Sequence, residues 1–171
     1  MTETSVEERT IEAMRATEDI DIGVATPSLD VLRRCGDEIR AALQVDVTVA
    51  LPDTEDPLGG VITVRGPDIR QIQVINFLNP IGMGDNPGRE AVACALDLSL
   101  GGTPVGVVDL EHLVAMKLFA GGMKNRADVV ELLAYNPEAD LEAIAALCAR
   151  HRLGDEWSAL LPEIATRRTR T

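Results

Sequence analysis

Hydrophobic residues follow two different periods along this chain, and the change of period near Asp109 divides it into two parts. Before that residue, short segments alternate apolar and polar residues, which is the pattern of half-buried strands. After it, apolar residues recur every three or four positions, which is the pattern of amphipathic helices. Strands that precede helices in this way are typical of the α+β or mixed α/β class. We therefore expect residues 1–108 to form a small mixed sheet region, and residues 109–171 to form a C-terminal helical subdomain of the same domain.

Hydrophobic periodicity, together with turn residues at some boundaries, predicts the individual elements. Strands are predicted at residues 19–25, 45–51, 61–65, 69–78 and 105–108. Helices are predicted at residues 5–14, 26–43, 89–97, 110–120, 124–134, 140–152 and 155–165. In the first strand, Ile20 and Ile22 alternate with polar residues, so we expect them to face the core. We expect Thr26 to cap the helix that follows, because a first-turn proline comes directly after it.

The chain is acidic and poor in aromatic residues. Among its 171 residues, 28 acidic residues outnumber 16 basic ones, and the formal net charge is −12. This balance excludes a surface that coats nucleic acid, and two Phe, one Tyr and one Trp are too few for a platform that stacks bases.

No apolar run approaches the ~18 residues of a membrane span. Three widely separated cysteines and an acidic N-terminus without a signal-peptide pattern indicate a cytoplasmic protein.

Two carboxylates are predicted side by side on the first strand. Asp19 and Asp21 stand two positions apart, so their side chains project from the same face. Like charges at that distance repel each other unless a cation lies between them. Mg²⁺ is a suitable cation, because it prefers oxygen ligands and leaves room for substrate phosphates. The alternative interpretation is a solvated face of an edge strand.

Lysine is rare in this chain and is concentrated in one segment. The only two lysines, Lys117 and Lys124, lie within eight residues of each other, whereas the chain has 14 arginines. On a continuous helix, Lys117, Lys124 and Asp128 would share one face, although Gly121-Gly122 interrupts the helical pattern. A lysine supported by a carboxylate suits the charge of a triphosphate. The alternative is an ordinary helical ion pair between Lys124 and Asp128.

Two segments carry a family resemblance. Residues 15–22, RATEDIDI, resemble the R-x-T-x-D-[IL]-D signature of the polymerase-β-like nucleotidyltransferase superfamily. Residues 108–118, VDLEHLVAMKL, with residues 124–132, KNRADVVEL, are similar to a second segment of that family, L-E-x-L-(I/V)-A-x-K-L followed by K-D-x-x-D. The two segments occur in the family's order. The chain resembles most the small bacterial nucleotidyltransferases of the abortive-infection-toxin type.

The resemblance implies a nucleotidyltransferase fold and Mg²⁺-dependent transfer of a nucleoside monophosphate from an NTP to an acceptor hydroxyl. The acceptor would be RNA, a protein or a small molecule, and the protein would be a toxin with a cognate antitoxin. Asp19 and Asp21 would hold one or two metal ions, and Lys117 would join them as a catalytic residue. The residues implied at the nucleotide are Arg15, Thr17, Lys117, Lys124 and Asp128, with Asp128 positioning Lys124.

The chain departs from the family at two places. Asn76 stands where the family has a third carboxylate. Its neutral amide would be a weakened metal ligand, and it could not act as a general base. The family's glycine-rich phosphate turn precedes the aspartate pair, but the first glycine here is Gly23, which follows the pair. Either the chain starts late or it lacks this phosphate-binding turn. A chain without its first structural element would expose hydrophobic core residues, which favours a homodimer that covers them.

Both departures favour an alternative function, in which the protein is a catalytically degenerate relative that binds or regulates a partner. An unrelated acidic interaction domain is the third alternative.

Two further features are predicted to be structural. The loop from Gly82 to Gly88 lacks the spacing of a dinucleotide-binding loop and the lysine of a P-loop, so we expect a structural turn. His112 and His151 are isolated from other metal-ligating residues in the sequence. We therefore expect both histidines to lie on helix surfaces rather than to bind a metal.

Overall fold

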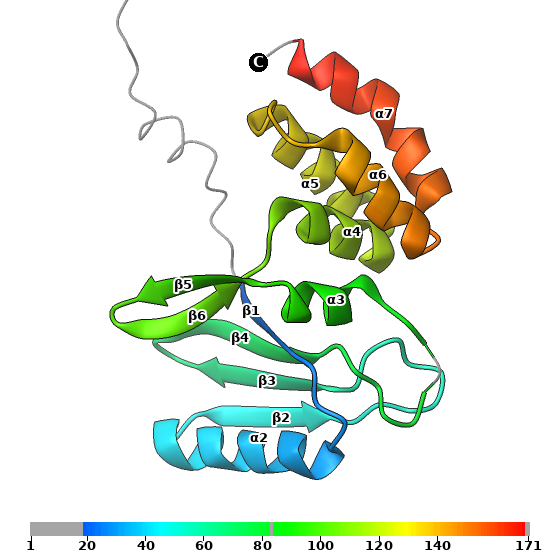
Figure 1. The fold of residues 1–171 in the computed structure, drawn as a ribbon. Coiled ribbons are helices and arrows are strands. Elements are labelled where there is room, and N and C mark those ends of the chain that lie inside the picture. The colour runs from blue at the N-terminus through cyan, green and yellow to red at the C-terminus, as the bar shows by residue number, and fades with distance from the viewer. Residues whose placement is uncertain (1–18, 83, 170–171) are drawn as a thin grey trace, which may run out of the picture.

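The computed structural model describes residues 19–82 and 84–169 (Figure 1). This part of the chain has six helices and six strands, and it confirms the predicted α+β class. The strands are β1 (Asp19–Val24), β2 (Asp46–Ala50), β3 (Val61–Gly66), β4 (Ile69–Asn76), β5 (Leu96–Leu100) and β6 (Thr103–Val107). The helices are α2 (Leu29–Leu43), α3 (Pro87–Ala93), α4 (Leu110–Ala120), α5 (Gly122–Tyr135), α6 (Leu141–Arg150) and α7 (Gly154–Arg168).

Most predicted elements are present within a few residues, and two local predictions were wrong. Helix α2 is capped by Ser28 and not by Thr26 as predicted, because the Ser28 hydroxyl accepts a hydrogen bond from the Val31 N–H. The Thr26 hydroxyl instead accepts from the Ser28 N–H. The helix predicted to reach residue 97 ends at Ala93, and strand β5 follows it. Strand β5 forms because its residues pair with β6 across a turn of two glycines with positive φ. The helix predicted at residues 5–14 lies outside the described residues.

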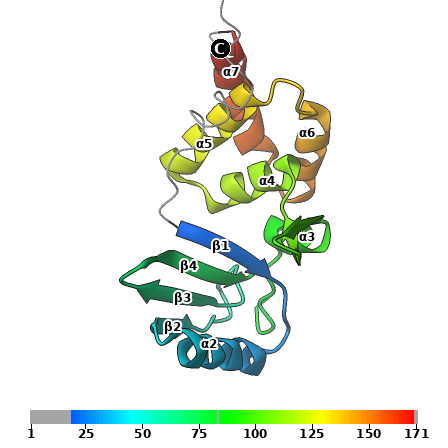
Figure 2. The ribbon, with the colours of Figure 1, turned by 90° about the vertical axis from the view of Figure 1, so that its left-hand side faces the viewer.

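The main sheet has the order β1-β4-β3-β2, with β1 parallel to β4 and the other neighbours antiparallel. Helix α2 packs against β2, at the edge opposite β1 (Figure 2). The buried residues between them are Leu32, Val47, Ile62, Val64 and Val74. Because α2 does not reach β1, Ile20 and Ile22 remain 47% and 45% exposed. The prediction that they face the core was therefore wrong.

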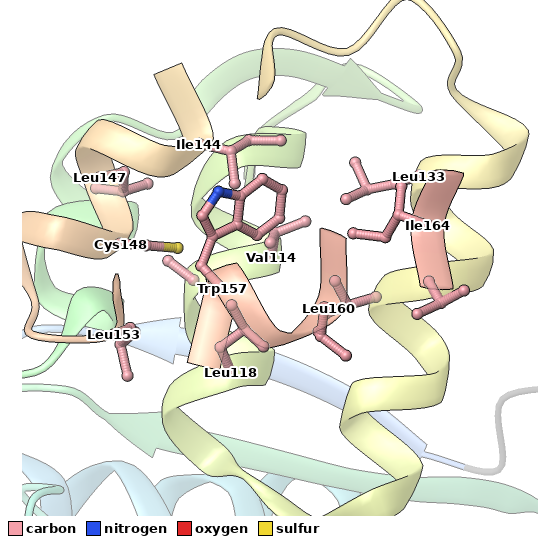
Figure 3. Close-up of a cluster of buried hydrophobic side chains, with 13 residues drawn as sticks. Val114, Leu118, Leu133, Ile144, Leu147, Cys148, Leu153, Trp157, Leu160 and Ile164 are labelled. Atoms are coloured by element: carbon pink, nitrogen blue, oxygen red, sulfur yellow. The ribbon is translucent and has the colours of Figure 1, made fainter. Parts of the chain in front are cut away.

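A second hydrophobic core lies among helices α4 to α7 and does not share residues with the first (Figure 3). Trp157 of α7 lies among side chains of α4 and α6, including Val114 and Ile144 (Figure 3). Helix α3 connects the two parts, because it packs against α4 and also against β1. No helix in residues 19–82 and 84–169 is both long enough and apolar enough to cross a membrane.

Buried asparagines hold the loops at the end of β4. The Asn79 side-chain amide donates to the Asp53 and Asp56 carbonyls at 2.8 and 2.9 Å. The Asn86 amide donates to the Pro57 carbonyl at 2.7 Å, and its oxygen caps α3. Each buried amide therefore satisfies backbone groups of a neighbouring loop. These contacts agree with the prediction that the glycine-rich loop before α3 is structural.

Replacing Gly88 by Ala is expected to destabilise the protein by about 1–3 kcal/mol. Gly88 is buried in the first turn of α3, and a Cβ atom there would overlap the Phe77 ring. A urea titration followed by circular dichroism measures the loss. Gly154→Ala in α7 is the matched control, because nothing lies within 4 Å of its added Cβ atom. An unchanged unfolding midpoint for Gly88→Ala would contradict the close packing of α3 on Phe77.

Candidate functional site

Strand β1 presents two carboxylates on the open face of the main sheet. Asp19 and Asp21 alternate with Ile20 and Ile22, so they project from the face opposite to the one that α2 covers. Partial burial and the charge of Asp19 raise the pKa of Asp21 above its usual value. The charge of Lys117 acts in the opposite direction and lowers the pKa of Asp21. The Asp pair is therefore electrostatically strained, and a cation nearby relieves part of that strain.

The partner of Lys117 is a carboxylate on the next helix. Lys117 Nζ lies 2.9 Å from Asp128 Oδ2, and the two side chains are 25% and 18% exposed. Gly121 ends α4 with φ 67°, and α5 begins at the next residue, so the two helices turn against each other. The turn brings Lys117 of α4 beside Asp128 of α5. The ion pair holds the Lys117 ammonium group in place.

The structure brings together residues from both sequence segments that carry the family resemblance. Asp21 belongs to the first segment, whereas Lys117 and Asp128 belong to the second. The effect of Lys117 on the pKa of Asp21 requires the ammonium group to lie near the carboxylate. Lys117, which Asp128 holds, is therefore close enough for its charge to act on the carboxylate pair of β1.

The predicted role of Asp128 as the residue that positions Lys124 was wrong. Asp128 accepts from Lys117 instead, and Lys124 is exposed with no ion pair to any other described residue. Lys124 and Asp128 lie four residues apart in α5, but the turn at Gly121 and Gly122 folds α4 against α5 and brings Lys117 to Asp128 instead. Arg15 and Thr17 lie outside the described residues.

The prediction that Asn76 is a metal ligand was also wrong. Asn76 pairs with Val24, so its side chain lies on the sheet face opposite to Asp21. It is fully buried, and its amide nitrogen donates to the carbonyls of Thr26, Gly59 and Leu78. Its amide oxygen accepts from the Thr26 and Leu78 N–H groups. Every polar atom of the Asn76 side chain is therefore used to hold the ends of β1 and β4 together.

The residue beside Asp21 on the open face is Gln73, which sequence reasoning missed. Gln73 pairs directly with Asp21, and Gln71 pairs with Asp19. Paired residues of neighbouring strands project from the same face. The position for a third ligand is thus occupied by the neutral amide of Gln73. Only the pairing of β4 with β1, which the sequence pattern does not specify, could have identified it.

The carboxylate pair suits a Mg²⁺ ion that arrives with a nucleotide. No group of three or more His, Cys, Asp or Glu residues in the described chain could hold a metal ion. Mg²⁺ in proteins is typically bound by one or two carboxylates together with substrate phosphates and water. Burial and the neighbouring Asp19 charge raise the pKa of Asp21, and a bound cation would favour its ionised form. Asp19 and Asp21 therefore fit a metal whose other ligands are phosphate oxygens.

A second polar cluster lies between α3, α4 and α6, and it corrects the prediction of surface histidines. The side chains of His112 and His151 are 11% and 7% exposed, and both face Glu90 of α3. Arg150 and His151 hold the Glu90 carboxylate at 2.7 and 2.9 Å. The Arg150 hydrogen bond is the main reason that the pKa of Glu90 is lowered. A cavity of about 510 Å³, which also contacts Ala25 after β1, opens beside Glu90 and His151.

No model of a known protein family matches the chain, and none of the curated proteins matches it. The family resemblance therefore depends on the two sequence segments alone.

Proposed function

We propose that this protein binds an NTP with Mg²⁺ and transfers the nucleoside monophosphate to an acceptor hydroxyl; the acceptor oxygen bonds to the α-phosphate, the bond to the β-phosphate breaks, and pyrophosphate leaves. One observation supports the proposal: the charge of Lys117, which is paired with Asp128, acts on Asp21 of the carboxylate pair of β1. Each pair alone has an ordinary structural explanation. A strained carboxylate pair beside an anchored ammonium group provides opposite charges for a metal and for the phosphates that it binds.

Each residue of the site has a distinct role in this proposal. Asp19 and Asp21 hold the Mg²⁺ ion, which when bound neutralises the triphosphate and polarises the phosphate under attack. Lys117 binds a phosphate oxygen and stabilises the charge that develops during transfer. Asp128 keeps the Lys117 ammonium group in one position. Gln73 lies beside the carboxylate pair and offers an amide oxygen or an N–H group to the metal shell or the substrate.

The acceptor is RNA, a protein or a small molecule, and a toxin with a cognate antitoxin is one context for such a reaction. A second function is favoured by the neutral Gln73 in the third-ligand position. Without a third carboxylate the site lacks an evident general base, and a degenerate relative would bind the nucleotide as a regulatory module. Incubation with each labelled NTP, Mg²⁺ and total RNA or cell lysate distinguishes the two. Transfer produces a labelled acceptor, whereas the degenerate relative binds the NTP and labels nothing.

Replacing Lys117 by Met is expected to weaken Mg²⁺–NTP binding about 10- to 100-fold, because the phosphate loses its charged ligand. The same replacement at Lys124 is expected to change the affinity less than 3-fold, since that side chain is exposed and unpaired among the described residues. Isothermal titration with each NTP at constant Mg²⁺ measures both. The two variants remove the same charge from the chain. Equal losses would mean that net charge, rather than the site, controls binding.

A further inference from the structure

The main sheet has two edge strands, β1 and β2, and only one of them has its apolar side chains covered in the described part of the chain. Helix α2 packs against β2, so Val47 of that strand is 5% exposed. Ile20 of β1 lies in the same cross-strand row as Val47 and projects from the same sheet face. Ile20 and Ile22 are nevertheless 47% and 45% exposed, because α2 does not reach them. The β1 edge therefore presents an apolar surface that the β2 edge does not.

The edge of β1 is protected by negative charge rather than by its backbone. Edge strands are commonly protected by proline, lysine or a bulge. The six residues of β1 contain no proline or lysine, and they pair with β4 in an unbroken parallel register. Helix α3 meets β1 near its C-terminal end, where a Cβ atom at Gly23 would contact the Val92 side chain at 3.1 Å. The exposed residues before that point include Asp19 and Asp21, whose charge repels an acidic strand and attracts a basic one.

Charge decides which occupant this edge accepts. Opposite charges on neighbouring strands stabilise a sheet, whereas like charges directly opposite each other destabilise it. A second copy of β1 would bring Asp19 and Asp21 against two more carboxylates. Residues 1–18 contain five glutamates and two arginines, so this segment of the chain is acidic as well. The phosphates of a nucleic acid are also anionic. Each of these three occupants is repelled by the carboxylate pair, whereas a basic strand is attracted.

We infer that the β1 edge binds an extended segment of a partner protein in which basic residues alternate with apolar ones. Such a segment adds a strand beside β1, and its main-chain groups bond to the outer backbone groups of β1. Its basic side chains then lie beside Asp19 and Asp21 on one face of the sheet. Its apolar side chains lie beside Ile20 and Ile22 on the other face, because side chains alternate along both strands. One partner thus covers both kinds of exposed side chain on β1, and the inference does not rest on the proposed function.

Peptide binding to the full chain in EDTA tests the inference without a metal or a nucleotide. The probe is a capped octapeptide in which Lys and Val alternate. Its control has the same composition, but its four Lys residues precede its four Val residues, so it cannot match both faces of β1. The alternating peptide is expected to bind about 10-fold more tightly in an NMR titration. Backbone amide hydrogens of residues 19–22 are expected to exchange more slowly in the complex, because a new strand covers them.

Variants of the protein identify the side chains that the peptide contacts. Asp19→Asn with Asp21→Asn is expected to weaken the alternating peptide about 3- to 30-fold, because two cross-strand charge pairs are lost. Ile22→Thr keeps a β-branched residue but removes apolar contact, and it is expected to weaken binding about 3-fold. Glu38→Gln with Asp46→Asn is the matched control for the charge change. It removes two exposed carboxylates from α2 and β2, at the opposite edge of the sheet, and should leave the affinity unchanged.

Three results would overturn the inference. Equal affinities for the two peptides, or equal losses in the two double variants, would mean that net charge alone attracts the peptide. Slow amide exchange at residues 19–22 before any peptide is added would mean that the chain itself or a second copy already occupies the edge. Absence of peptide binding would also overturn it, even if the protein binds Mg²⁺–NTP. A protein that binds the alternating peptide but no NTP would instead contradict the proposed function alone.

Discussion

Replacement of both Asp19 and Asp21 by Asn is expected to remove Mg²⁺-dependent NTP binding, with an affinity loss on the order of 100-fold or more. The two carboxylates are the groups on the open face of β1 that a metal ion with phosphate ligands would require. The fold should be retained, because both residues are exposed and their mutual repulsion is removed. Isothermal titration with and without Mg²⁺ measures the loss.

Asp46→Asn is the matched control for this double variant. Asp46 starts β2 at the opposite edge of the same sheet, three strands away from β1. It is exposed, and its replacement also removes negative charge from the surface. Binding should therefore be retained in Asp46→Asn. Persistent Mg²⁺-dependent binding in the double variant would exclude the Asp pair as the metal site.

The same pair predicts how binding depends on pH. The pKa of Asp21 is raised in the folded protein, so the proton competes with the metal at a higher pH than for an ordinary aspartate. Mg²⁺ affinity is expected to be full well above that pKa and to decrease as pH falls through it. Because a raised carboxyl pKa favours the protonated folded state, ionised Asp21 opposes folding at neutral pH and ceases to do so in acid.

The second large effect is expected at Asn76. Asn76→Asp is predicted to destabilise the protein by about 3–5 kcal/mol, because it buries a charge without a partner. A carboxylate cannot donate to the three carbonyl groups that the Asn76 amide now satisfies. The urea midpoint, followed by circular dichroism, measures the loss. If Asn76→Asp instead strengthened Mg²⁺ binding in a stable fold, the assignment of Asn76 to the opposite face would be wrong.

Gln73→Glu is the matched change on the open face. It also introduces one carboxylate on β4, but at the position that pairs with Asp21. We expect little change in stability in the presence of Mg²⁺ and a tighter affinity for the ion, since a third carboxylate joins the pair. Opposite outcomes at residues 73 and 76 follow from the alternation of side chains along one strand.

Local patterns in the sequence were sufficient to predict most of the helices. Asp109 and Asp140 cap α4 and α6, and their side chains accept hydrogen bonds from the first turns. The apolar periodicity beyond them identifies the residues that pack around Trp157. Strand β5 was not predicted, because its conformation depends on pairing with β6 rather than on its own residues.

The site was only partly predictable for the same reason. The spacing of Asp19 and Asp21 correctly placed both carboxylates on one face of a strand. Lys117 was identified by its rarity in the composition, but Asp128 was assigned to Lys124, whereas in the structure it pairs with Lys117 across two helices. The Glu90 cluster was missed, because its two histidines belong to different helices that meet only after packing.

By itself, the sequence determined most of the helices, most of the strands, and the residues that share a face of one element. These properties depend on interactions within a few residues of one another. Only the tertiary structure decided that Gln73 rather than Asn76 lies beside Asp21, that Asp128 holds Lys117, and that His112 faces Glu90. Strand order and helix packing decide such contacts, and the hydrophobic effect that drives packing is non-directional, so no local pattern specifies them.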